Sequence, residues 1–348
     1  MSRIQKKLTT INLKPILSNE EIKKHEGHYF NEDYYTKHNK IVTSNTDVYG
    51  IEPDGTRKLL FKFRKNVIPE QICINAYHAL EKHAKHKNSN RGAAAGKLSL
   101  KKLPKHVGQV IKTDSYRVFY KTKDGKVSRD NVGNIAQSNI AGFYDRPDRN
   151  EYNTKSTTRK PKTVPMCRTT QFTKKNVEKW KNTIPLIKAA DKLFKKLVPD
   201  RYKIQLERAK HTPKFQIDNT AYSTITVNYN WQTATHCDNG DLDEGFGNLI
   251  VLEKVKAKSK ANAKLQEKCE GFTGGYLGFP KWGICVDVRQ GDFLAMDVHE
   301  YHSNTPIVGD GRLSVVCYLR KKMINCSSFY QKAAFAKRQL LPKAAPKR

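Results

Sequence analysis

Three polar side chains in the C-terminal half of the chain have the types and spacing of a metal site. His236 and Asp238 lie two residues apart, and His302 follows 66 residues after the first histidine. Residues i and i+2 of a β-strand project to the same side, so His236 and Asp238 can reach one ion. Two histidines and one carboxylate leave open positions on a non-heme ferrous ion, the arrangement found in oxygenases. We therefore predict an Fe(II) site formed by His236, Asp238 and His302.

A basic and a hydroxylic side chain follow the distal histidine. Arg312 comes ten residues after His302, and Ser314 lies two residues further on, so both can point inward from one strand. A guanidinium binds a carboxylate through two parallel hydrogen bonds. An oxoacid such as 2-oxoglutarate chelates a metal through its 2-oxo acid end and needs such an anchor for its far carboxylate. The pair therefore predicts a clamp for that cosubstrate.

Two assignments near these residues stay open. His299 competes with His302 as the distal ligand, although the ten-residue step to Arg312 favours His302 because it leaves a hairpin of the usual length. Cys237 lies between the first two ligands and should point the other way, as a buried thiol.

Short strands are expected to carry these residues. Residues 223–229 alternate with a period of two, and further β-like runs are separated by clusters of Gly, Asp, Asn and Pro. These runs are 248–252, 274–279, 284–288, 293–296 and 313–319. Many short strands at this spacing favour a β-sandwich or jelly roll over a sheet of βαβ units. We predict an α+β fold, mainly β, in which a double-stranded β-helix (jelly-roll) dioxygenase core has flanking supporting helices.

Helices and hairpins are predicted upstream of this core. A turn at Pro53-Asp54-Gly55 suggests a hairpin over 46–63, and a helix should run from 69 to about 83. Thr173 can cap a helix, and Pro185 is placed to open the next one in its first turn.

The domain boundaries are predicted as follows. A basic N-terminal arm, expected to be flexible, covers 1–45, and an α+β extension packed on the core covers 46–165. The core covers 166–330 with a Lys-rich insertion at 253–270, and a basic tail covers 331–348.

Two segments allow two interpretations each. The small residues of Asn90–Gly96 either bring the backbone close to a ligand or another element, or form a flexible connector. The Lys-rich insertion either contacts phosphates or is simply solvated.

The charge balance points to a polyanionic partner. The chain has 348 residues with 65 Lys and Arg against 33 Asp and Glu, a formal net charge of +32. Nucleic acid is the simplest partner for such an excess, and a basic proteome or a need for solubility is the alternative.

The cysteine spacing and the hydropathy indicate the cellular compartment. Seven cysteines at wide spacings, without a Cys-x-x-Cys pair, argue against a disulfide framework and a structural zinc site and favour a reducing compartment. No signal peptide or membrane span is seen. We expect an intracellular monomer, located in the nucleus if the source is eukaryotic or in the infected host cell if it is viral.

Motifs across about 220–326 resemble one known family. They are Asn228-Tyr229-Asn230-Trp231, Thr235-His236-Cys237-Asp238-Asn239-Gly240-Asp241, Gly245-Phe246-Gly247-Asn248, Gly274-Gly275-Tyr276, Phe279-Pro280, Val286-Asp287-Val288-Arg289-Gln290-Gly291-Asp292 and Met296-Asp297-Val298-His299-Glu300-Tyr301-His302. In this order they resemble the TET/JBP family of dioxygenases that modify nucleic acids. Upstream, residues 90–96, 138–146 and 167–169 look like elements of the phage, viral and fungal members.

The resemblance implies a reaction and its machinery. It makes His236, Asp238 and His302 the iron ligands, and Arg312 and Ser314 the clamp for 2-oxoglutarate. The cofactors implied are Fe(II), 2-oxoglutarate and O2, with ascorbate as a candidate reductant. The substrate implied is the 5-methyl group of a pyrimidine in double-stranded DNA, flipped out of the duplex. Either 5-methylcytosine becomes 5-hydroxymethylcytosine and is oxidised further, or thymine becomes 5-hydroxymethyluracil.

The resemblance also implies a base pocket. Asp241 matches a position that contacts the base, Tyr318 matches a stacking aromatic residue, and Asn228 is assigned to the same pocket. A carboxylate at Asp241 can accept from cytosine N4 or from thymine N3, so it does not choose the base. Arg320 stands where animal members have a histidine, and the animal cysteine-rich zinc region has no counterpart here. The alternatives are an RNA or protein hydroxylase of the same chemistry, or an inactive basic DNA-binding module.

Overall fold

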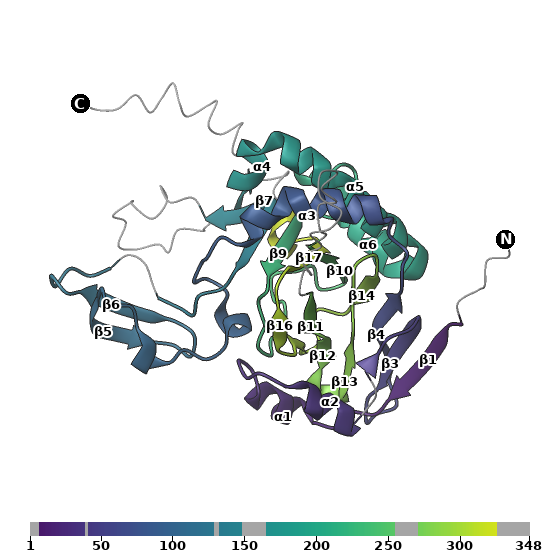
Figure 1. The fold of residues 1–348 in the computed structure, drawn as a ribbon, viewed down its shortest axis with the longest axis horizontal. Helices are drawn as coiled ribbons and strands as arrows, with labels where there is room; N and C mark the ends of the chain where they lie inside the picture. The colour runs from purple at the N-terminus through teal and green to yellow at the C-terminus, as the bar shows by residue number, and fades with distance from the viewer. Residues whose placement is uncertain (1–6, 39–40, 129–131, 148–164, 255–270, 326–348) are drawn as a thin grey trace, which may run out of the picture. The chain divides into compact units, whose positions relative to one another are not determined.

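The computed structural model describes residues 7–38, 41–128, 132–147, 165–254 and 271–325, and these are mainly β-strands with flanking helices (Figure 1). They fall into two compact units. The first unit contains Met1–Asn139, Thr226–Asn239 and Gly247–Val316, and the second contains Ile140–Ile225, Gly240–Phe246 and Cys317–Arg348. The chain thus passes between the units several times, which differs from the simple boundaries expected at 46 and 166. Most of the predicted Lys-rich insertion and the whole predicted tail lie outside the described residues.

The N-terminal segment expected to be a flexible arm is folded in its described part. Its elements are β1 (Thr9–Leu13), α1 (Asn19–Lys24), α2 (Glu32–His38) and β2 (Ile41–Val42). Ser18 and Glu21 form a capping box at the start of α1, which satisfies main-chain N–H groups that a helix leaves free. Ile22 and Tyr35 are 1% and 0% exposed. The arm prediction was wrong because a few well-spaced apolar residues anchor an otherwise polar segment.

The predicted hairpin over 46–63 is confirmed. Strands β3 (Thr46–Ile51) and β4 (Arg57–Arg64) pair antiparallel (Figure 1). β4 continues the sheet to β14 (Phe293–Met296), which pairs with β10 (Gly247–Glu253). β1 lies parallel to β3 at the edge of this sheet.

A second, smaller sheet of the first unit faces the same core. Its order is β15 (Ser303–Asn304), β12 (Leu277–Phe279), β13 (Ile284–Val286) and β2. One hydrophobic cluster contains residues of both sheets, and the rings of Phe61 on β4 and Phe279 on β12 stack with centroids 5.3 Å apart. The first unit is therefore a sandwich of two sheets that bury their inner faces against each other.

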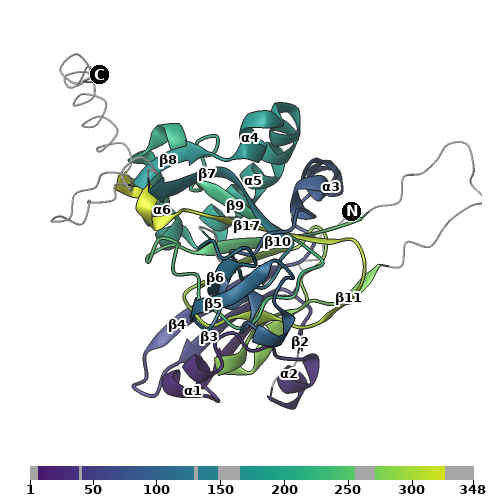
Figure 2. The same cartoon turned by 90° about the vertical axis from the view of Figure 1, so that its left-hand side faces the viewer.

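The remaining elements of the first unit flank this sandwich. Helix α3 (Glu70–Ala84), which confirms the helix predicted from 69 to about 83, lies on β10. Two 3-10 turns, η1 (Gly92–Ala95) and η2 (Leu100–Lys102), lead into a separate hairpin of β5 (Val107–Thr113) and β6 (Val118–Thr122), seen side by side in Figure 2. Strands β11 (Phe272–Gly274) and β16 (Ile307–Gly309) form another antiparallel pair, and η5 (Pro280–Trp282) connects β12 to β13.

The boundary between the units falls within three strands. These are β7 (Ser138–Pro147), β9 (Thr224–Tyr229) and β17 (Arg312–Tyr318). The second unit also holds β8 (Pro165–Thr169), α4 (Gln171–Lys175), α5 (Val177–Leu197), α6 (Pro199–Lys210), η4 (Pro213–Phe215) and η6 (Lys321–Asn325).

Two helix boundaries of the second unit differ from the prediction. Thr170, rather than Thr173, is the N-cap of α4, and its side chain accepts from the Thr173 N–H. Pro185 does not open a helix, because it lies inside the continuous α5. Its ring lies on the exposed face, where water can hydrate the carbonyl group that loses its N–H donor. The buried stripe that includes Leu186 and Phe194 holds the helix in place around it.

The described cysteines are of two kinds. Cys73, Cys237, Cys285 and Cys317 are free thiols, whereas Cys167 is disulfide-bonded, which the expected reducing compartment did not anticipate. Among the residues that the structure describes, no helix is both long enough and apolar enough to cross a membrane.

Folding of the N-terminal segment can be tested at Tyr35. Its ring fills the space beside Gly278, and its hydroxyl lies 3.2 Å from Ser303 Oγ. Tyr35→Ala should lower the free energy of unfolding by about 3–5 kcal/mol, as truncation of a buried aromatic ring does. Leu8→Ala, at a residue of the same segment that is 51% exposed, should change it by no more than about 0.5 kcal/mol. Denaturant unfolding followed by circular dichroism measures both, and equal small effects would mean that the segment is an arm after all.

Candidate metal and cosubstrate site

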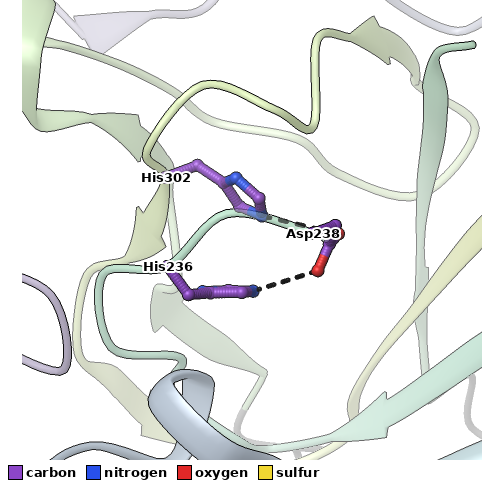
Figure 3. Close-up of side chains that lie close together, drawn as sticks. All are labelled: His236, Asp238 and His302. Atoms are coloured by element: carbon purple, nitrogen blue, oxygen red, sulfur yellow. Dashed lines mark ion pairs between the residues drawn. The ribbon is translucent and has the colours of Figure 1, made fainter. Parts of the chain in front are cut away.

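The metal-type residues come from two segments of the first unit that lie side by side. His236 and His302 form an isolated antiparallel bridge, in which each N–H donates to the other residue's carbonyl at 3.0 Å. The Asp238 N–H donates to the Val298 carbonyl, also at 3.0 Å. These main-chain bonds bring the three side chains together, as Figure 3 shows. His236 and Asp238 thus lie in a bridged segment after β9 rather than in a regular strand, but they share one side as predicted.

Both imidazole rings are fixed in the same tautomer. His236 Nδ1 lies 2.7 Å from the Ala234 carbonyl oxygen, and His302 Nδ1 lies 2.9 Å from that of Glu300. A carbonyl oxygen only accepts, so each Nδ1 carries the proton and each Nε2 keeps a free lone pair. The two Nε2 atoms lie 3.6 and 3.8 Å from the oxygens of Asp238. The lone pairs therefore converge on the carboxylate, as ligands of one ion must.

Burial keeps the His302 imidazole neutral, which is the form that binds a metal ion. The side chain is almost fully buried, and this burial, reinforced by the neighbouring His236, lowers the pKa of His302 to about 4. A neutral imidazole is the form that binds a metal ion, so at neutral pH no proton must leave His302 first.

The structure separates the alternatives around this group. Within the described ranges, His236, Asp238 and His302 are the one set of three or more His, Cys, Asp or Glu residues whose donor atoms all lie within 4.8 Å of one another. His299 is not part of it, and its Nδ1 lies 3.3 Å from Asp297 Oδ1 instead. Burial raises the pKa of the Cys237 thiol to about 12, so it is protonated and also lies outside the group.

Arg312 is a buried cation that lacks an anionic partner. It lies on β17 and is 2% exposed, and Nη2 donates to the Gly275 carbonyl at 2.9 Å. Its Nε is buried without a hydrogen-bond partner, and no carboxylate pairs with the guanidinium among the described residues. Burial, followed by the nearby Arg289, lowers the pKa of Arg312 to about 10, which still leaves it charged at neutral pH. An unpaired buried charge is costly, so this site is suited to an anionic ligand.

Ser314 and Asn228 lie together beside this strand. Ser314 Oγ accepts from Asn228 Nδ2 at 3.1 Å, and Asn228 Oδ1 is buried without a partner. Asn228 had been assigned to the base pocket, but the structure places it against a residue of the predicted clamp. Hydrogen bonding between strands, which the sequence does not display, decides this placement.

Gly275 is a residue that the sequence analysis did not assign to the site. It has φ +68°, and a Cβ there would lie 2.8 Å from Arg312 Nε. Only glycine leaves room for the guanidinium at this point. The Gly274-Gly275 pair is the sequence signal that could have indicated this close approach.

The other three base-pocket residues lie together in the second unit. Asp241 and Arg320 form a backbone bridge, and both Asp241 and Tyr318 are buried. Arg320 Nε pairs with Asp145 Oδ1 at 2.5 Å. Burial alone would lower the pKa of Arg320, but Tyr318 and Asp145 outweigh it and raise the pKa. The guanidinium of Arg320 is thus already engaged by a carboxylate, unlike that of Arg312.

Comparison with known proteins identifies the domain. Residues 152–321 match the Tet_JBP family, described as the oxygenase domain of the 2OGFeDO superfamily. The bifunctional helicase and thymine dioxygenase JBP2 of Trypanosoma cruzi (strain CL Brener) is 31% identical over 213 residues, which cover 59% of this chain and 17% of that protein. Thymine dioxygenase JBP1 of Trypanosoma brucei brucei is 28% identical over 298 residues, which cover 83% of this chain and 32% of JBP1.

These relatives are several times longer than the matching region, so the chain spans only 17% and 32% of their lengths. Among solved structures, NgTET1 in complex with 5mC DNA aligns with a TM-score of 0.44 and 12% identity over 88% of this chain and 92% of that chain. On the family match, residues 152–321 are similar to the oxygenase domain of the TET/JBP family, within the 2-oxoglutarate- and Fe(II)-dependent dioxygenase superfamily.

Proposed function

We propose that this protein oxidises the 5-methyl group of a pyrimidine in DNA, using Fe(II), 2-oxoglutarate and O2. The observation that carries the proposal is the pairing, in one TET/JBP-type chain, of three converging metal donors with a buried and unpaired arginine. In this proposal the two-sheet sandwich of the first unit is the double-stranded β-helix, or jelly roll, of the dioxygenase.

The residues have separate tasks. His236, Asp238 and His302 would hold Fe(II) through Nε2, a carboxylate oxygen and Nε2, and the open positions that such a ligand set leaves suit 2-oxoglutarate and O2. Arg312 would bind the far carboxylate of 2-oxoglutarate, because its Nε has no hydrogen-bond partner. Ser314 would donate to the same carboxylate, because its hydroxyl accepts from Asn228 and can still donate. Iron with its cosubstrates supplies the oxidising power that replaces a C–H bond of the methyl group by C–OH.

Thymine is the base that the relatives favour. The curated relatives are named thymine dioxygenases, so we propose thymine as the first substrate and 5-hydroxymethyluracil as its product, with 5-methylcytosine as the alternative. A methyl group inside a duplex cannot approach a buried metal, so the nucleotide must be flipped out. Asp241, Tyr318 and Arg320 are proposed to contact the base.

The β5–β6 hairpin is proposed to grip the DNA backbone. Residues 97–126 contain nine Lys or Arg and two Asp. The hairpin is tied to the metal-ligand segment, because the Tyr116 hydroxyl donates to Glu26 at 2.6 Å and the Tyr301 hydroxyl, next to His302, donates to its other oxygen at 3.4 Å. Ile111 and Phe119 are 51% and 38% exposed among these lysines, which suits contact with sugars and bases.

Removal of the carboxylate ligand tests the metal site. Asp238→Ala should lower turnover by at least about 100-fold while DNA affinity stays within about twofold, because the metal and the phosphates are held by different residues. The measurements are succinate release and mass spectrometry of nucleosides from DNA containing either thymine alone or added 5-methylcytosine. Asp200→Ala, at an exposed aspartate on α6, is the matched control. Succinate release with RNA or peptide but not with DNA would show that the substrate is not DNA. No succinate release at all from iron-loaded protein would refute the proposed enzymatic activity.

Truncation of the buried cation tests the cosubstrate clamp. Arg312→Met should raise the KM for 2-oxoglutarate by about 10–100-fold, since a hydrogen bond to a charged group contributes about 1.5–3 kcal/mol. Binding of a divalent metal should be unchanged, because Arg312 is not a ligand. Arg57→Met, at an exposed arginine of β4, should leave both constants as they are. Equal loss of metal and cosubstrate binding in Arg312→Met would show a folding defect rather than a clamp.

Four exposed lysines test the hairpin together with the residues on either side of it. Replacement of Lys101, Lys105, Lys112 and Lys123 by alanine should weaken DNA binding and lower the slope of log K against log salt by about 0.9 for each phosphate that is no longer neutralised. The control replaces four exposed lysines of the second-unit helices, Lys192, Lys195, Lys196 and Lys203. Fluorescence anisotropy at several salt concentrations compares the two variants. The hairpin assignment fails if the slope falls equally in both variants.

A further inference from the structure

A cluster of four charged side chains lies in the first unit, outside the proposed metal site, with Lys281 buried and Glu52, Lys58 and Glu300 partly buried. Lys281 is 3% exposed and donates to both carboxylate oxygens of Glu52, at 2.7 and 2.9 Å. Lys58 pairs with Glu52 at 2.5 Å and also with Glu300. Glu300 accepts a further hydrogen bond of 2.9 Å from the indole Nε1 of the buried Trp282. The cluster is electrically balanced, with two lysines and two glutamates.

Stability alone does not explain such a cluster. Removing charges from water is costly, and well-packed apolar residues often stabilise a core equally well. What a fully paired cluster does supply is a fixed geometry, because Glu52, Lys58 and Glu300 each have two partners and Lys281 donates to both oxygens of Glu52. Glu300 is held from two sides, by the ammonium group of Lys58 and by the indole of Trp282.

The main chain of Glu300 leads directly to the metal donors. Its carbonyl oxygen lies 2.9 Å from His302 Nδ1 and so fixes the tautomer and the plane of that ring. Two residues earlier, the Val298 carbonyl accepts from the N–H of Asp238. One segment therefore orients a histidine donor and the backbone of the carboxylate donor, and Glu300 is the side chain that ties this segment to the cluster.

We infer that Glu300 is a positioning residue. Lys58 and Trp282 hold its side chain, so that its main-chain carbonyl orients the His302 ring with Nε2 toward the metal. This inference rests on the proposed metal site. The side chains of the cluster are not among the three donors, and they act on His302 through the main chain of Glu300. Groups that orient metal-binding histidines in this way typically change metal affinity by about 10–100-fold when they are removed.

The test measures metal binding rather than turnover. Apoprotein is titrated with Co(II) by calorimetry, and the ligand-field absorption of bound Co(II) reports the arrangement of the donors. Glu300→Ala should raise the Kd for Co(II) by about 10–100-fold and shift the absorption bands. Glu300→Gln should stay within about threefold of the wild type, because its amide oxygen can still accept from Trp282 or Lys58.

Asp47 provides the matched control. It is a carboxylate of the same unit with similar burial, and it also pairs with two cations, Lys62 at 3.3 Å and Arg64 at 2.7 Å. Asp47→Ala should lower the unfolding midpoint while the Kd and the Co(II) spectrum of the folded protein remain those of the wild type.

The outcomes separate the inference from the metal site itself. Unchanged Co(II) affinity and spectrum in Glu300→Ala would overturn the inference and leave the metal site standing. If Glu300→Ala does not fold, Lys58→Met and Trp282→Phe decide: weaker Co(II) binding in either supports the inference, and wild-type binding in both overturns it. A wild-type protein that binds no Co(II) or Fe(II) would refute the proposed metal site, and the positioning role with it.

Discussion

The site depends on one pair of main-chain hydrogen bonds, those between His236 and His302. They join two segments 66 residues apart in the chain and so bring the second histidine to the first two donors. Both rings then use the same local device, a hydrogen bond from Nδ1 to the carbonyl oxygen two residues earlier. The sandwich of two sheets holds the segments in register, because β14 and β15 flank the segment that carries His302.

The pairing of cationic side chains sets the proposed cosubstrate clamp apart from other positions in the protein. Arg320 is satisfied by Asp145, and Lys281 is satisfied by Glu52. Arg312 is as deeply buried as Lys281 but has an unpartnered Nε. A folded protein keeps an unpaired buried cation only at a cost, and a ligand that supplies the missing anion removes this cost. The room for the guanidinium itself depends on Gly275, where any side chain would meet it.

Local sequence patterns predicted regular elements well and exceptions less well. The hairpin around Pro53-Asp54-Gly55 and helix α3 follow from turn chemistry and an apolar stripe, which are local properties. Pro185 failed as a helix start because tertiary packing of α5 overrides the local preference. The N-terminal segment failed as an arm because the burial of Ile22 and Tyr35 depends on partners far along the chain, such as Ser303.

The sequence by itself indicated two pairs of candidate site residues, His236 with Asp238 and Arg312 with Ser314, since their i, i+2 spacing sets a common side on any extended backbone. It also determined the basic character of the chain. Only the tertiary structure decided which groups are desolvated and which are paired: that His302 rather than His299 joins the donors, that Asn228 lies on Ser314, and that Glu300 is held by Lys58, 242 residues away in the chain. Burial and pairing depend on contacts between residues far apart in the chain, and a local sequence pattern does not specify those contacts.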